Sequence, residues 1–203
     1  MFCSCEQNMI EPFLESNRYI DCDHPEVRRQ AFMLAGGCGS EEEIARACFH
    51  YVRDAIRHSW DWRLNPVTCR ASEVLAHGTG FCYAKSHLLA ALLRANGIPA
   101  GLCYQRLRLE AGGDRFCLHG LNAVRLPFHG WYRLDPRGNK EGVEARFCPP
   151  DEHLAFQSGA GEIDLPGIWA EPWPAVAEVL TTSMSVNEVY DRLPDHDVLR
   201  PLT

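Results

Sequence analysis

The chain has 203 residues, of which 46% are hydrophobic and 23% are charged, and its formal net charge at pH 7 is -7. This length and composition are typical of one soluble globular domain that can bury a core without support from a metal or a disulfide. The negative charge argues against a nucleic acid or an anionic membrane as the main partner.

The ten cysteines do not follow the pattern of a disulfide scaffold. The first residues carry neither the basic segment nor the apolar stretch of a signal peptide, and no apolar run has transmembrane length. We therefore expect reduced thiols in the cytoplasm. Cys3, Cys5, Cys22 and His24 offer four zinc ligands, but their spacing matches no common zinc module, so we predict neither a metal nor a cofactor.

Apolar residues recur at helical spacing in segments ahead of the first predicted strand. Ser40 is a good N-cap because Glu43 follows three residues later, as in a capping box. Residues 58–69 mix tryptophan, asparagine and proline and are predicted to form an irregular connection. The predicted helices are His24–Leu34, Ser40–Arg57, Ala71–Ala76 and Phe81–Asn96.

The helix Phe81–Asn96 is predicted to be the central helix of the core, because its apolar residues leave few positions for solvent. Asn96-Gly97 followed by Pro99 is a strong stop signal. His87 falls on a different side of this helix from Cys82, and we expect it on the polar face.

Three strands follow, and their short connections predict an antiparallel meander packed on the central helix, which is an α+β arrangement. The predicted strands are Ala100–Leu109, Arg115–Leu126 and Trp131–Asp135. Beyond Gly138 the chain is rich in proline, and helices are predicted at Ala175–Thr182 and Ser185–Arg192. No linker divides the sequence, so residues 1–203 are predicted to form a single domain.

The clearest chemical signal is a cysteine followed by a histidine and an aspartate. Cys82 comes directly after a Gly-rich turn and opens the central helix. Free N–H groups and the positive end of the helix dipole lie there, and both favour the nucleophilic thiolate. His119 lies in the second predicted strand and Asp135 ends the third. Taken alone, His119 fits a buried core histidine and Asp135 a turn residue before Pro136; together the three residues predict nucleophilic catalysis.

These segments resemble the transglutaminase-like superfamily. The resemblance lies in residues 71–82 (ASEVLAHGTGFC), residues 92–100 (LLRANGIPA), His119 on its strand, and residues 131–135 (WYRLD). It implies a papain-like core of about residues 44–138, in which Cys82 is the nucleophile, His119 the base and Asp135 its orienting partner. The chain is most similar to the compact bacterial branch of transglutaminase-like cysteine proteases, and no acidic loop has calcium-ligand spacing.

The resulting prediction is a thiol-dependent amide hydrolase or acyltransferase that acts on a peptide or protein amide through a thioester. Hydrolysis is favoured over cross-linking because water needs no acceptor pocket. The alternatives are a protein-glutamine transamidase, a non-catalytic binding or scaffold module of the same fold, and a protein that binds metal through its N-terminal cysteines. No feature of the sequence predicts an oligomeric state.

Three structural expectations follow from this assignment. His119 and Asp135 must share one sheet face, so the turn near Pro127–Gly130 must have an odd length or one strand must carry a bulge. The backbone N–H of Cys82 is the first oxyanion donor, and the second comes from Tyr51, Trp60 or Asn65. Residues 139–203 carry no family motif, and we hypothesise that they cap or gate the cleft.

Overall fold

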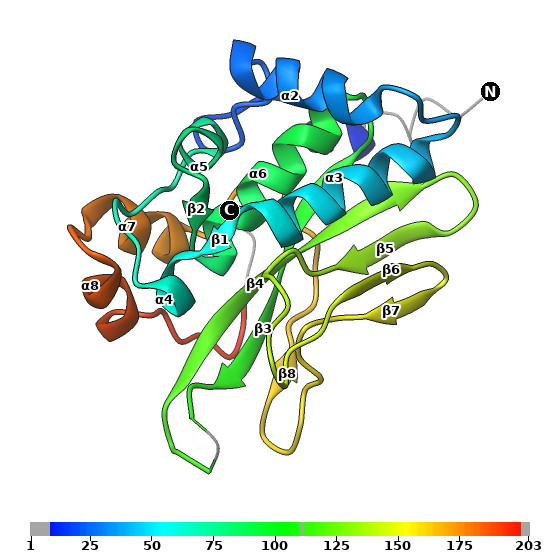
Figure 1. The fold of residues 1–203 in the computed structure, drawn as a ribbon. Helices are drawn as coiled ribbons and strands as arrows, with labels where there is room; N and C mark the ends of the chain where they lie inside the picture. Colours follow the sequence, from blue (N-terminus) through cyan, green and yellow to red (C-terminus); the bar gives the residue numbers. More distant parts are fainter. Residues whose placement is uncertain (1–8, 111, 200–203) are drawn as a thin grey trace.

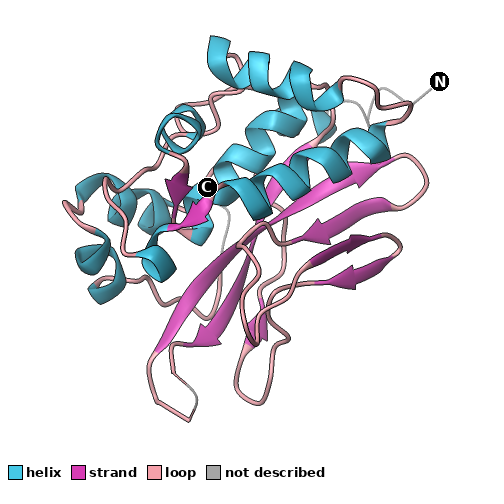
Figure 2. Ribbon diagram, in the orientation of Figure 1, coloured by secondary structure: helices cyan, strands magenta, loops and turns pink. Residues whose placement is uncertain are grey.

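A curled antiparallel sheet packs against a group of helices in the computed structural model, which describes residues 9–110 and 112–199 (Figure 1). The helices gather on one side of the sheet (Figure 2), as expected for an α+β fold. The sheet has four strands in the order β5-β4-β3-β8. Its strands are β3 (Ala100–Arg108), β4 (Phe116–Leu126), β5 (Gly130–Leu134) and β8 (Ile163–Asp164).

The predicted helices form close to their predicted bounds. Ser40 accepts a hydrogen bond from the backbone N–H of Glu43, which confirms it as an N-cap. The irregular connection after this helix contains one short helical turn. The helices are α2 (Pro25–Ala35), α3 (Glu41–Ala55), α4 (Ser59–Trp62), α5 (Ala71–His77), α6 (Cys82–Ala95), α7 (Pro174–Thr182) and α8 (Val186–Asp191), with a 3-10 turn at Glu11–Phe13.

The helix α6 lies at the centre of the core, as predicted, and every residue from 82 to 94 is buried. The expectation for His87 is wrong. Its side chain is fully buried, and its Nδ1 lies 2.7 Å from the carbonyl oxygen of Cys69. The segment before α5 covers this side of α6, which the periodicity of α6 alone does not indicate.

The turn between β4 and β5 has an odd number of residues, as predicted. Leu126 pairs with Gly130, so the loop contains the three residues 127–129. Extension of this register places Asp135 opposite Leu121 and therefore on the same sheet face as His119. The geometric condition for a His-Asp pair is met.

Several short elements have no sequence signal. The strand β8 adds to the free edge of β3, β6 (Arg146–Cys148) pairs with β7 (Asp151–His153), and β1 (Arg57–His58) runs parallel to β2 (Thr79–Gly80). Within residues 9–110 and 112–199, no helix combines the length and hydrophobicity that crossing a membrane would require.

Candidate active site

Cys82 is held at the first turn of α6 by the two-residue strand β2 that precedes it. Gly80 pairs with His58 of β1, and the hydroxyl of Thr68 donates to the carbonyl oxygen of Thr79 over 3.0 Å. A Cβ atom on Gly80 would lie 3.2 Å from both Ala84 Cβ and Thr68 Oγ1, so only glycine fits this approach without displacement. The backbone directly before α6 is therefore tightly packed.

The start of α6 is fixed directly against β4 beside His119. Tyr83, the residue after Cys82, donates its hydroxyl to the carbonyl oxygen of Leu118. A Cβ on Gly120 would lie 2.8 Å from Tyr83 Cδ1 and 3.2 Å from Tyr83 Cα. The absence of a side chain at Gly120 thus permits the close approach that brings Cys82 and His119 into one cavity.

His119 and Asp135 form a buried hydrogen-bonded pair. The ring Nε2 of His119 lies 2.7 Å from Oδ2 of Asp135, and Asp135 is fully buried. The carboxylate also accepts from the backbone N–H of Arg137 over 3.0 Å and from that of Ala155 over 3.3 Å. The ring of Phe156 packs edge-on against His119, with centroids 5.0 Å apart. The ring is therefore oriented, and its Nδ1 remains for Cys82.

The surroundings of His119 favour its protonated form. Burial alone would lower the pKa of the ring, but the charges of Asp135 and Cys82, together with hydrogen bonds to both, raise the pKa to about 10. An imidazolium beside a thiol is the arrangement that stabilises a thiolate.

The cavity that contains Cys82 and His119 has a volume of about 570 Å³. Of the three candidates for the second oxyanion donor, only Trp60 lines it. Asn65 does not line the cavity, and its Oδ1 accepts from the backbone N–H of Val186 over 2.9 Å. Tyr51 does not line this cavity.

A charged group in the lining of the cavity was not predicted from the sequence. Asp61 accepts from the guanidinium of Arg137 over 2.8 Å and from the ammonium of Lys140 over 2.7 Å, and His58 Nδ1 lies 3.5 Å from the same carboxylate. Burial opposes ionisation of Asp61, but the hydrogen bonds from Arg137 and Lys140 lower its pKa to about 2. Burial, followed by the charge of Arg137, places the pKa of His58 well below its ordinary range. Arg137 could have been found, because it lies two residues after Asp135.

A second unpredicted group is the fully buried Lys85, one turn after Cys82 on α6. Its ammonium donates to the carbonyl oxygens of Ile56 and Arg53 at the end of α3. Burial lowers its pKa to about 7, against the opposing charge of Asp135. Lys85 thus ties the end of α3 to the helix that carries the nucleophile.

Four of the other cysteines are poor competitors for Cys82. Burial raises the pKa of Cys48, Cys69, Cys103 and Cys117 to about 12. Cys117 lines the same cavity as Cys82. Within the described residues no three side chains are grouped as metal ligands, while Cys3 and Cys5, two of the four possible zinc ligands, lie outside those residues.

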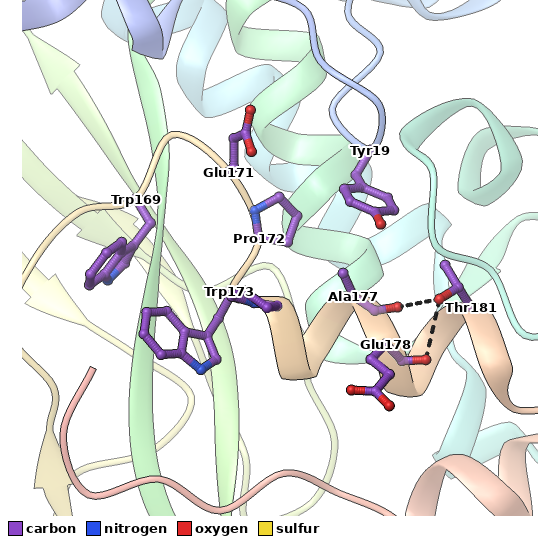
Figure 3. A pocket seen from close by; sticks show the side chains of 9 residues that line it. Tyr19, Trp169, Glu171, Pro172, Trp173, Ala177, Glu178 and Thr181 are labelled. Carbon is purple, nitrogen blue, oxygen red and sulfur yellow. Dashed lines mark hydrogen bonds between the residues drawn. The ribbon is translucent and has the colours of Figure 1, made fainter. Parts of the chain in front are cut away.

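A separate hollow of about 540 Å³ lies against α7 and contains none of the three predicted site residues (Figure 3). Its walls include Trp169, Trp173 and Tyr19, with Glu171 and Glu178 at its edge. This hollow is therefore separate from the cavity at the start of α6.

Comparison with known proteins identifies the family and the fold. The sequence model of the transglutaminase-like superfamily matches residues 28–136, which is more than half of the chain. The structure is similar to that of a "putative cysteine protease" from Cytophaga hutchinsonii, with a TM-score of 0.51 and 20% identity over 64% of this chain. It is also similar to the periplasmic domain of TgpA from Pseudomonas aeruginosa, with a TM-score of 0.50 and 18% identity over 66% of this chain.

The chain spans 42% and 48% of the length of these two proteins, respectively. At such identities the likeness establishes the papain-like α+β fold. Among curated proteins, none matches the sequence.

Proposed function

Because the chain belongs to the transglutaminase-like superfamily, we propose that it is a thiol-dependent amide hydrolase or acyltransferase that uses Cys82, His119 and Asp135. One observation carries the proposal: the His119 ring is fixed by Asp135 through Nε2, over 2.7 Å, within the cavity that Cys82 also lines. A nucleophile, a base and a group that orients the base are the parts that covalent acyl transfer requires.

In the proposed reaction the Cys82 sulfur attacks the carbonyl carbon of an amide and forms a C–S bond. The C–N bond then breaks as His119 gives its proton to the leaving amine, and a thioester remains. Water attacks the thioester next, His119 takes its proton, and the C–S bond breaks to release the acid and regenerate the thiolate. If an amine attacks instead of water, the product is a new amide.

Asp135 has an electrostatic role in this scheme. Its carboxylate stabilises the imidazolium and fixes the ring so that Nδ1 faces the sulfur. The backbone N–H of Cys82 lies at the N-terminus of α6, where helix N–H groups have no helical acceptor, and it is the proposed first donor to the oxyanion. The proposed substrate is a peptide or protein amide, and the proposed acceptor is water.

The test is alkylation by iodoacetamide at about pH 6, where ordinary thiols react slowly, followed by peptide mapping. We expect fast, selective modification of Cys82 in the wild type and its loss in His119→Ala. His129→Ala is the matched control, because His129 lies in the loop before β5 and outside the cavity. Slow and uniform modification of many cysteines in the wild type would favour the scaffold alternative over catalysis.

A further inference from the structure

The last described helix and the residues after it form an arm, Val186–Asp195, that borders the cavity of Cys82. The arm begins at the side chain of Asn65, which accepts from Val186, and ends at β3, where Arg106 binds Asp195 through two hydrogen bonds of 2.5 and 2.8 Å. It therefore bridges the helical side of the molecule and the sheet.

Within the arm, Tyr190 stacks on Trp60 of α4. The two rings are nearly parallel, at 2°, with centroids 3.6 Å apart, and the guanidinium of Arg63 lies 3.4 Å from the centre of the Trp60 ring. This stack joins α4 to α8 and presents an aromatic wall to the cavity.

Further along, the arm occupies the edge of β4 next to the proposed base. The strand β5 pairs with β4 only from Asn122 to Leu126, so β5 does not cover the edge near His119. At that edge the carbonyl oxygen of Pro194 accepts from the backbone N–H of Leu118 over 2.7 Å. The hydrogen bond fixes the neighbouring Leu193, whose side chain lines the cavity.

The sheet supplies an apolar wall opposite the arm. Leu107 pairs with Cys117 across β3 and β4, so the two side chains share the sheet face of His119. Leu109 lines the same part of the cavity. The lining of the cavity also holds charged groups that are already paired: the two cations beside Asp61 bind that carboxylate, and Glu162 accepts from the backbone N–H of Arg108 over 2.8 Å.

We propose that the arm and the sheet together form an apolar subsite beside Cys82, which makes Tyr190 and Leu193 specificity-determining residues. The proposal rests on the proposed function and specifies its substrate class: amides that carry an apolar or aromatic side chain next to the reacting carbonyl. A charged side chain would lose its hydration against Tyr190, Leu193 and Leu107, so such substrates are disfavoured.

The experiment compares two alkylating agents and needs no natural substrate. N-Benzyl iodoacetamide carries an aromatic group, whereas iodoacetamide carries none. The measured quantity is the ratio of their rate constants at Cys82, divided by the same ratio for glutathione. In the wild type we expect a preference of about tenfold or more, which is the range that a small apolar group provides in a hydrophobic pocket.

Two substitutions in the arm test the assignment. Tyr190→Ala removes one wall, and Leu193→Asn makes the subsite polar while keeping the branched side-chain shape at a half-buried position, so that folding is preserved. Both should reduce the preference to about twofold or less, while the rate with iodoacetamide alone stays within about twofold of the wild type. Met184→Ala is the matched control, since Met184 is 84% exposed and precedes the arm.

The outcomes separate this proposal from the one on which it rests. A wild-type preference near one, or a preference that survives both substitutions while Cys82 reacts rapidly with iodoacetamide, overturns the subsite and leaves the proposed function intact. If Cys82 shows no selective reaction with iodoacetamide, both proposals fail.

Discussion

Asp135 determines the charge of the proposed base. Its buried carboxylate accepts three hydrogen bonds. The ring of His119 and the backbone N–H of Ala155 donate to Oδ2, and the backbone N–H of Arg137 donates to Oδ1. Because these donors lie on separate segments, the carboxylate also joins the end of β5 to the chain around Ala155.

Replacement of Asp135 by asparagine should remove the charge that opposes the burial of His119. We expect Asp135→Asn to lower the pKa of the ring and to reduce the alkylation rate of Cys82 at about pH 6 by about 10²-fold, at the low end of what an acid-base group contributes. The measurement is the rate of Cys82 modification across pH, with Asp151→Asn, an exposed aspartate of β7, as control. An unchanged profile would show that Asp135 is not coupled to the thiol.

The three candidate residues could be proposed from the sequence, whereas their surroundings could not. Cys82 follows glycines at a helix start, and the alternation of strand residues fixes the relation between His119 and Asp135. His58 and Asp61 become neighbours of the site only through the parallel pairing of β1 with β2, a contact between two-residue strands that no periodicity reveals.

At the scale of elements, the contact between α6 and β4 positions the site. Gly120 lies under the first turn of α6, where Tyr83 fills the space that a side chain would occupy. The helix and the strand were both predicted because their apolar periodicities are long and regular. By contrast, β8, β6 and β7 have two or three residues each, and their pairing depends on tertiary contacts.

A methyl group at Gly120 should separate the two elements. We expect Gly120→Ala to reduce the free energy of unfolding by about 1–3 kcal/mol, because the new Cβ would meet the backbone of α6. Cys82 should also react more slowly, since its sulfur moves away from His119. Denaturant unfolding and iodoacetamide kinetics measure the two effects.

The control for this substitution is Gly39→Ala. Gly39 is exposed, and the nearest atom to its Cβ position is the flexible end of Glu43 at 3.5 Å. If Gly120→Ala matches this control in both stability and reactivity, the close approach of α6 to β4 does not position Cys82.

Across the whole molecule, two buried cations give opposite dependences of stability on pH. The pKa of Lys85 is lowered from 10.5 to about 7, so between these values the unfolded chain binds more protons and stability rises with pH. The pKa of His119 is raised from 6.5 to about 10, so its contribution is complete below 6.5 and falls as the pH rises toward 10.

Single substitutions should reveal how each group makes the stability depend on pH. Between about pH 7 and 8.5, the free energy of unfolding of Lys85→Met should fall relative to the wild type, and that of His119→Gln should rise, each by about 1 kcal/mol per pH unit. Denaturant unfolding at both pH values measures the difference. Parallel profiles for the three proteins would contradict the opposing shifts.

Residues 139–203 were the least predictable part of the chain, because they match no family motif. The structure shows that they supply β8, the pair β6 and β7, and core side chains such as Val176, Val186 and Leu199. The predicted helices α7 and α8 were visible in the sequence, but the position of α8 beside α4 depends on single contacts such as the stack of Tyr190 on Trp60.

The enclosure of α6 has a consequence for the divergence of this protein. A helix whose residues 82–94 are all buried offers no surface on which neutral mutations can accumulate. Changes of volume there must be compensated by partner changes in α2, α3, α5 or the sheet, so related chains should differ in this helix by covarying pairs, while exposed positions of α2 drift independently.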